Sequence, residues 1–265
     1  MNQDFSNKCI DIIKKHIPEG CVVQSKREFV RRRDGSEYTD IDFYYYKDSV
    51  SPDIVYRDFF VFEFARLSKN WVELRPNKRI IGTPSPILAV YEDGELRFTS
   101  NNNKEMPFDK ETSYTECKFY TKNKETNKFE FSKDYVNDDV RKIVASSLKV
   151  LTDAIKEIDC PNITLTVYPI VVTEQKMDVK IPVFNYTLGN DVKELPFLDG
   201  ISLKNLEPVI VQIFNVSELD IILPIMNYSI QLTEMLHLFG EDVMRMMFDP
   251  LVNEMKQDDE NYRDH

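Results

Sequence analysis

The stretch DYVNDDVRKIVASSLKVLTDAIKEI, residues 134–158, decides which fold class the sequence predicts. Its apolar residues recur at steps of three and four, the spacing that places side chains on one face of an α-helix. These residues are Val136, Val140, Ile143, Val144, Leu148, Leu151, Ala154, Ile155 and Ile158. Asp138 and Asp139, near the start, suit the positive end of a helix dipole. The pattern predicts a long amphipathic helix in the middle of the chain.

On both sides of this helix the sequence has the pattern of β-strands. Two Asp-Gly pairs, at 34–35 and 93–94, stand between extended runs and favour tight β-hairpins. Long apolar runs at 53–68, 162–173 and 207–215 predict further strands. The sequence therefore predicts an α+β protein, with antiparallel hairpins in a β-rich N-terminal half, a mixed sheet after the helix and a helical C-terminal end.

Helical patterns also occur near both ends of the chain. Residues 4–16 have apolar side chains at helical spacing and predict a short amphipathic helix. Ser217 with Asp220 resembles a capping box, from which a helix is expected to run to Gly240. Residues 241–257 predict one more short helix.

These elements divide the chain into three predicted regions. Residues 1–132 form a β-rich region with the N-terminal helix, residues 133–257 an α+β region, and residues 258–265 an acidic tail. A chain of 265 residues is long enough for one large domain or two smaller ones. The sequence leaves open whether the first two regions are one continuous domain.

The charge and the cysteine content narrow the classes of partner. Asp and Glu outnumber Lys and Arg by 45 to 34, which gives a net charge of −11. Such a chain is repelled by nucleic-acid phosphates and anionic membranes, so neither is an expected partner. No apolar run approaches the ~20 residues that cross a bilayer. Four cysteines without a C-x-x-C pair argue against structural zinc and fit reduced thiols in a cytoplasmic protein.

The candidate site lies in RRRDGSEYTDIDFYYYKD, residues 31–48. Asp40 and Asp42 are two residues apart, so on a strand they share one face. Two such carboxylates, with a third from a neighbouring strand, can hold Mg²⁺ for phosphoryl transfer. Glu63 is the expected third ligand. A charged residue in a run as apolar as FFVFEFA is costly to bury, so we expect it to have a function.

Two known patterns resemble this part of the sequence. The Gly-Ser pair at 35–36, ahead of the Asp-x-Asp strand, locally resembles the nucleotidyltransferase pattern, although that family has a helical turn or more between the two parts. Asp53, followed by Glu63-x-Ala65, is similar to the Pro-Asp, strand, Glu-x-Lys order of metal nucleases, with Ala65 where the catalytic lysine belongs. The second pattern would pair Asp53 with Glu63. Together the resemblances imply an Mg²⁺-dependent nucleotidyltransferase or nuclease that uses Asp40, Asp42 and Glu63.

A competing interpretation needs no metal. If Asp34-Gly35 is a two-residue hairpin turn, Arg27 and Arg31 share a face with Asp40 and Asp42. Counting outward from the turn pairs Arg31 with Tyr38, Phe29 with Asp40 and Arg27 with Asp42. Opposite charges across a hairpin stabilise each other by roughly 0.2–1 kcal/mol per pair. Arginine side chains would then neutralise the carboxylates of Asp40 and Asp42, and no metal ion would be needed.

The sequence favours a non-catalytic protein that binds other protein chains, as a homo-oligomer or a subunit of a larger assembly. Methionine, which suits adaptable binding surfaces, is frequent near the C-terminus. These methionines are Met226, Met235, Met244, Met246, Met247 and Met255. Scarce glycine and frequent Asn, Lys and Ile are typical of a phage or bacterial accessory protein, in the cytoplasm or in a virion. In this interpretation there is no catalytic residue, cofactor or metal. The alternative is the Mg²⁺ enzyme with Asp40, Asp42 and Glu63.

Overall fold

The computed structural model describes most of the chain before residue 228. The described residues are 3–25, 29–51, 53–65, 71–80, 87–100, 112–123, 125–132, 135–174, 183–206 and 209–227. The chain separates into two compact units, Met1–Leu223 and Pro224–His265. The fold and the site below belong to the first unit. The predicted helix at 241–257 and the acidic tail lie outside the described residues.

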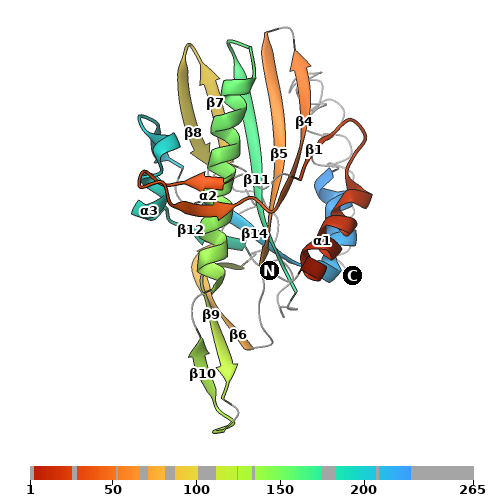
Figure 1. The fold of residues 1–265 in the computed structure, drawn as a ribbon, viewed down its shortest axis with the longest axis vertical. Coiled ribbons are helices and arrows are strands. Elements are labelled where there is room, and N and C mark those ends of the chain that lie inside the picture. Colours follow the sequence, from red (N-terminus) through yellow and green to blue (C-terminus); the bar gives the residue numbers. More distant parts are fainter. Residues whose placement is uncertain are drawn as a thin grey trace, which may run out of the picture. The chain divides into compact units, whose positions relative to one another are not determined.

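Both helices and strands are present, so the predicted α+β class is confirmed (Figure 1). In chain order the elements are α1 (Gln3–His16), β1 (Val22–Gln24), β2 (Phe29–Arg31), β3 (Glu37–Asp40), β4 (Phe43–Ser51), β5 (Ile54–Ala65), β6 (Trp71–Ile80), β7 (Ile87–Glu92), β8 (Glu95–Ser100), β9 (Thr112–Lys122), β10 (Phe129–Ser132), α2 (Tyr135–Glu157), β11 (Ile163–Thr173), β12 (Val183–Tyr186), α3 (Asn190–Lys193), the 3₁₀ turn η1 (Pro196–Leu198), β13 (Ser202–Asn205), β14 (Val209–Asn215) and the 3₁₀ turn η2 (Val216–Glu218). The long middle helix predicted over 134–158 is α2 and is also confirmed.

Twelve strands of the described chain form one mixed sheet, with β11 at its centre. The main path through the sheet is β1-β4-β5-β11-β14-β12-β9-β10. One edge of β11 pairs with β5 in parallel along its whole length. Its other edge pairs with β7, antiparallel, at 163–167 and with β14, in parallel, at 170–173. The predicted regions on either side of residue 132 therefore contribute strands to the same sheet.

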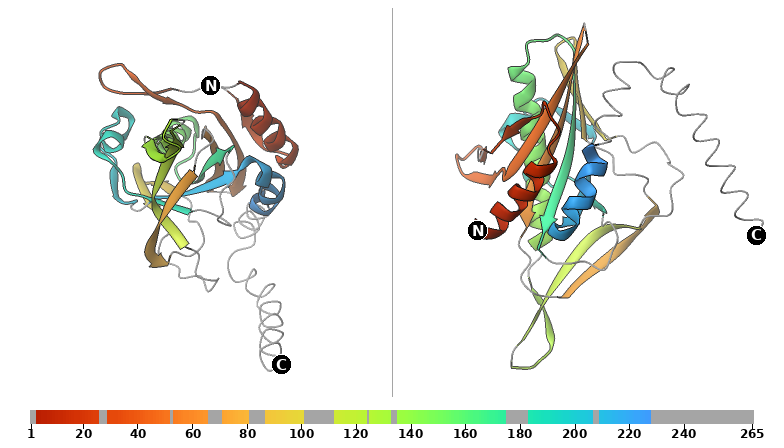
Figure 2. Two further views of the ribbon diagram at one scale, coloured as in Figure 1. Left: turned by 90° about the horizontal axis from the view of Figure 1, so that it is seen from below. Right: turned by 90° about the vertical axis from the view of Figure 1, so that its right-hand side faces the viewer.

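Strand β5 is covered on both faces. Helix α2 packs against β5 and β11 on one face, while α1 lies on the other side of β5 (Figure 2). Phe59 and Val61 join the core beneath α2, whereas Phe60 stacks on Tyr45 and Tyr168, with ring centroids 5.0 and 4.7 Å apart. A strand buried on both faces reads as a nearly continuous apolar run, as this one does.

Helix α2 is more enclosed than an amphipathic surface helix. Every residue at 143–148 is buried, including Ser146 and Ser147. The reason is that strands β2 and β3 and the turn η1 contact α2 in addition to the sheet. The predicted apolar stripe is present, but the opposite face is covered in the middle of the helix.

The two predicted Asp-Gly turns have different outcomes. Asp93 and Gly94 both have positive φ, 52° and 81°, as a two-residue type I′ turn requires, and they join β7 to β8. The two-residue turn predicted at 34–35 is wrong. The Gly35 amide donates to the Arg32 carbonyl (3.0 Å) and the Arg32 amide to the Ser36 carbonyl (2.8 Å), which makes a three-residue loop with Gly35 in the left-handed region.

The extra loop residue changes the register of the β2–β3 hairpin only near its tip. Arg31 pairs with Glu37 instead of the predicted Tyr38. A bulge then restores the predicted pairing of Phe29 with Asp40. Arg27 lies outside the described residues, so its predicted pairing with Asp42 stays a prediction.

The 3₁₀ turn η2, which leads into the helical residues 219–227, begins differently from the predicted capping box. The cap is Asn215, whose side chain accepts a hydrogen bond from the Ser217 amide (2.9 Å), while the Glu218 carboxylate accepts one from the Asn215 amide (2.9 Å). The predicted Ser217–Asp220 box is therefore wrong, and Asp220 Oδ1 lies 2.8 Å from His16 Nε2 instead.

Within the described ranges, no helix is both long and apolar enough to cross a bilayer.

Candidate functional site

Carboxylates gather where β4 begins, β5 ends and α2 begins. Residues 43 and 62 are paired across β4 and β5, so Asp42, just before β4, lies beside the end of β5. Asp42 Oδ2 accepts a hydrogen bond from the Phe64 amide (2.8 Å), which fixes its carboxylate there. Asp139 comes from the first turns of α2. We call Asp42, Glu63 and Asp139 the acidic cluster.

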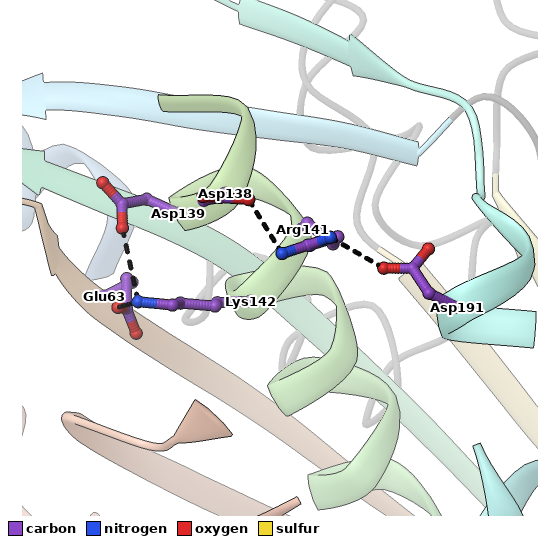
Figure 3. A network of polar contacts seen from close by, with 6 residues as sticks. All are labelled: Glu63, Asp138, Asp139, Arg141, Lys142 and Asp191. Carbon is purple, nitrogen blue, oxygen red and sulfur yellow. Dashed lines mark hydrogen bonds and ion pairs between the residues drawn. The ribbon is translucent and has the colours of Figure 1, made fainter. Parts of the chain in front are cut away.

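Glu63 is the most deeply buried member of the acidic cluster. It lies on the face of β5 that packs against α2, and only 6% of its surface is exposed. Its Oε1 atom is 3.9 Å from Lys142 Nζ (Figure 3). Its Oε2 atom is buried and has no hydrogen-bond partner among the residues that the structure describes. A buried carboxylate with so little compensation is costly to ionise.

Burial is the main reason that the pKa of the Glu63 carboxyl is raised well above its usual value. Asp42 and Asp139 raise the same pKa further, because a second negative charge nearby disfavours ionisation. Lys142 lowers it, and the contribution of Asp40 is the smallest of these. The electrostatics therefore link the members of the acidic cluster, and Asp40 affects the Glu63 pKa less than Asp42 or Asp139 does.

Asp139 shares Lys142 with Glu63. Lys142 Nζ lies 3.7 Å from Asp139 Oδ1, longer than a hydrogen bond to either carboxylate would be. Burial raises the pKa of Asp139 to about 6, the nearby charges of Asp138 and Asp42 raise it too, and Lys142 opposes the shift. One ammonium group thus faces two buried carboxylates without a short bond to either.

A second set of ion pairs holds the start of α2 in place. Arg141 bonds Asp138 within the helix (2.7 Å) and Asp191 of α3 (2.9 Å), as Figure 3 shows. Residues three apart on a helix lie on the same side. Asp138 and Arg141 are therefore directed toward α3, while Asp139 and Lys142 are directed toward β5.

The structure brings together only part of the carboxylate trio predicted from the sequence. Asp42 and Glu63 are neighbours, whereas Asp40 has the smallest effect on the Glu63 pKa, and Asp139 is the third carboxylate of the cluster. The alternative pairing of Asp53 with Glu63 is wrong. These residues lie at opposite ends of β5, and ten strand residues span about 33 Å.

Sequence reasoning missed Asp139 and Lys142. The sequence indicates only a helix-dipole role for Asp139 and no role for Lys142. The available signal was their position beside the buried stripe, since the buried Val140 directly follows Asp139 and the buried Ile143 directly follows Lys142. Charges three residues apart next to a buried stripe face the neighbouring element. What they meet there depends on tertiary structure.

The comparisons with known proteins give no assignment. No family model, no curated protein and no solved structure matches the chain. In their present positions, the described residues include no group of three His, Cys, Asp or Glu side chains arranged to hold a metal ion. The chemistry has to be argued from the acidic cluster itself.

We expect the acidic cluster to reduce stability as the pH rises from about 4, the ordinary pKa of Asp139, through its raised pKa of about 6. The raised pKa values of Glu63 and Asp139 mean that the folded state binds more protons than the unfolded state in this window. The free energy of unfolding therefore falls as the pH rises. Asp139→Asn should flatten this slope and raise stability near pH 7 by about 1–2 kcal/mol. Urea denaturation across this pH range, with a chelator present, measures both.

Asp153→Asn is the matched control, because Asp153 lies on the same helix and pairs with Lys149. It should keep the wild-type pH slope. Equal slopes for wild type and Asp139→Asn would contradict the expectation.

Proposed function

We propose that the acidic cluster binds a divalent cation and that the protein is an Mg²⁺-dependent phosphoryl-transfer enzyme, a nuclease or a nucleotidyltransferase. The observation that carries this proposal is the Glu63 carboxylate. It is buried beside Asp42 and Asp139, and its Oε2 atom has no partner in the part of the chain that the structure describes. A native protein that keeps such a group at a cost in stability commonly uses it.

Charge balance supports a cation. When ionised, the acidic cluster carries three negative charges, and Lys142 supplies one positive charge. The imbalance can be relieved by protonation or by binding a positive group. Carboxylate oxygens are the ligands that Mg²⁺ prefers in proteins, so the donor set fits this ion.

Lys142 supports the enzymatic part of the proposal. The metal-nuclease pattern places a lysine two residues after the glutamate, where this chain has Ala65. Lys142 brings an ammonium group to Glu63 from α2 instead, 3.9 Å from its carboxylate. In such a site the cation lowers the pKa of a water and neutralises charge on the phosphoryl group. The chain's own lysine would hold the phosphate or the attacking water in position.

The overall charge bears on the substrate. A net charge of −11 opposes binding of long polyanions, whose affinity depends on contacts to many phosphates. We therefore propose a nucleotide or a short phosphodiester as the substrate, in preference to duplex DNA. We place this activity in the cytoplasm of a bacterium or of a phage-infected cell.

Calorimetric titration with Mg²⁺ and Mn²⁺ tests the proposal. We expect one saturable site in the wild type and a loss of at least about tenfold in affinity in Glu63→Gln, since a neutral amide is a poor substitute for a carboxylate ligand. Cleavage of a chromogenic phosphodiester should require the metal and should fall in the same variant. Glu63→Gln also removes a buried charge, so it is expected to fold.

Glu157→Gln is the control, because Glu157 is an exposed carboxylate at the far end of α2. It should bind metal as the wild type does. If the wild type shows no saturable binding, or if Glu63→Gln binds equally well, the proposal is wrong.

A second candidate is the protein-binding role predicted from the sequence, as a homo-oligomer or a subunit of a phage or bacterial assembly. It is favoured by β1, where Val22 and Val23 are 42% and 40% exposed. Within the described chain β1 pairs with β4 alone, so its other edge is open to another strand.

Light scattering over a concentration series should show self-association that Val23→Lys weakens. A monomer at every concentration would count against the homo-oligomer.

A further inference from the structure

We propose that Lys142 is an internal counter-ion of the acidic cluster, which a divalent cation must displace in order to bind. The inference rests on the proposed function, because it concerns the same cation site. It assigns Lys142 two positions. Without the ion, the ammonium group stands between Glu63 and Asp139. With the ion bound, it turns outward, toward the solvent side of the cluster.

The first argument is the position of the ammonium group. Lys142 Nζ lies 3.9 Å from Glu63 Oε1 and 3.7 Å from Asp139 Oδ1 (Figure 3). A cation that bound both carboxylates would need the same oxygens at ~2.0–2.1 Å for Mg²⁺. The lysine and the ion therefore compete for one place, which agrees with the lack of a ready metal-binding arrangement among the described side chains.

The second argument is how loosely Lys142 is held. Among the residues that the structure describes, both of its ion pairs are longer than a hydrogen bond, and its side chain is 37% exposed. On the same helix, Lys149 makes a direct hydrogen bond to Asp153, and its side chain is 21% exposed. A lysine has a flexible four-carbon stem, so Lys142 can move its ammonium group into water while α2 stays in place.

The third argument is the charge of each state. Three ionised carboxylates and one lysine leave two negative charges uncompensated. Binding of one Mg²⁺, with the Lys142 ammonium group at the solvent side of the cluster, brings the net charge of the site to zero. The displaced ammonium group is then free to face a bound phosphate. Lys142 therefore partly stabilises the metal-free protein and remains useful after the exchange.

The experiment compares Mn²⁺ affinity in the wild type, Lys142→Met and Lys149→Met. Methionine keeps an unbranched apolar stem without the charge. Calorimetry is done near pH 7 and again near pH 8, because the raised pKa of Glu63 leaves less of its carboxyl group protonated at the higher pH. We expect Lys142→Met to bind Mn²⁺ at least about tenfold more tightly than the wild type, because the ion no longer has to displace a positive charge that lies 3.9 Å from Glu63 Oε1 and 3.7 Å from Asp139 Oδ1. Lys149→Met should bind as the wild type does.

The possible results separate this inference from the proposed function. Tighter binding in Lys142→Met supports the exchange, including the case in which only this variant binds detectably. Wild-type binding that Lys142→Met leaves unchanged or weakens would overturn the exchange but leave the cation site standing. If neither protein binds Mn²⁺ at either pH, while circular dichroism shows both to be folded, the cation site and the exchange are both wrong.

Discussion

The parallel pairing of β5 with β11, covered by helices, is the constraint on which the rest of the structure depends. The pairing runs the full length of β11 and leaves no solvent-facing side for most of β5. Apolar side chains make such burial favourable, at roughly 25 cal/mol per Å² of area removed from water. The same burial makes any charge on β5 expensive. Glu63 is such a charge, and the position of α2, which brings Asp139 and Lys142 to it, is fixed by the same packing.

The parts of this structure that follow from local chemistry could be predicted from the sequence. The 3.6-residue period of 134–158 identified α2 almost to its ends, and Asp93-Gly94 identified a hairpin, because both signals act within a few residues. The turn at 34–35 shows the limit of this reasoning. The same dipeptide forms a longer loop there, in which Asp34 accepts hydrogen bonds from the amide and the hydroxyl of Ser36.

The site itself was only half predictable. Asp42 and Glu63 could be connected because Asp42 directly precedes β4 and Glu63 lies on β5, the partner of β4 in one hairpin. Asp139 and Lys142 could not, because about 75 residues separate them from Glu63 and only the crossover of α2 onto the sheet joins them. Asp53 fails for the opposite reason. It is close to Glu63 in sequence, but an extended strand keeps the two apart.

The central claim is that three carboxylates from three elements form one cation site that Lys142 occupies in the absence of the ion. The most direct measurement is an anomalous difference map from crystals of the wild-type protein soaked in Mn²⁺. The account predicts one strong peak contacted by oxygens of Asp42, Glu63 and Asp139, with the Lys142 ammonium group turned away. A map without a peak at the acidic cluster, in which Lys142 keeps its ion pairs to Glu63 and Asp139, would contradict it.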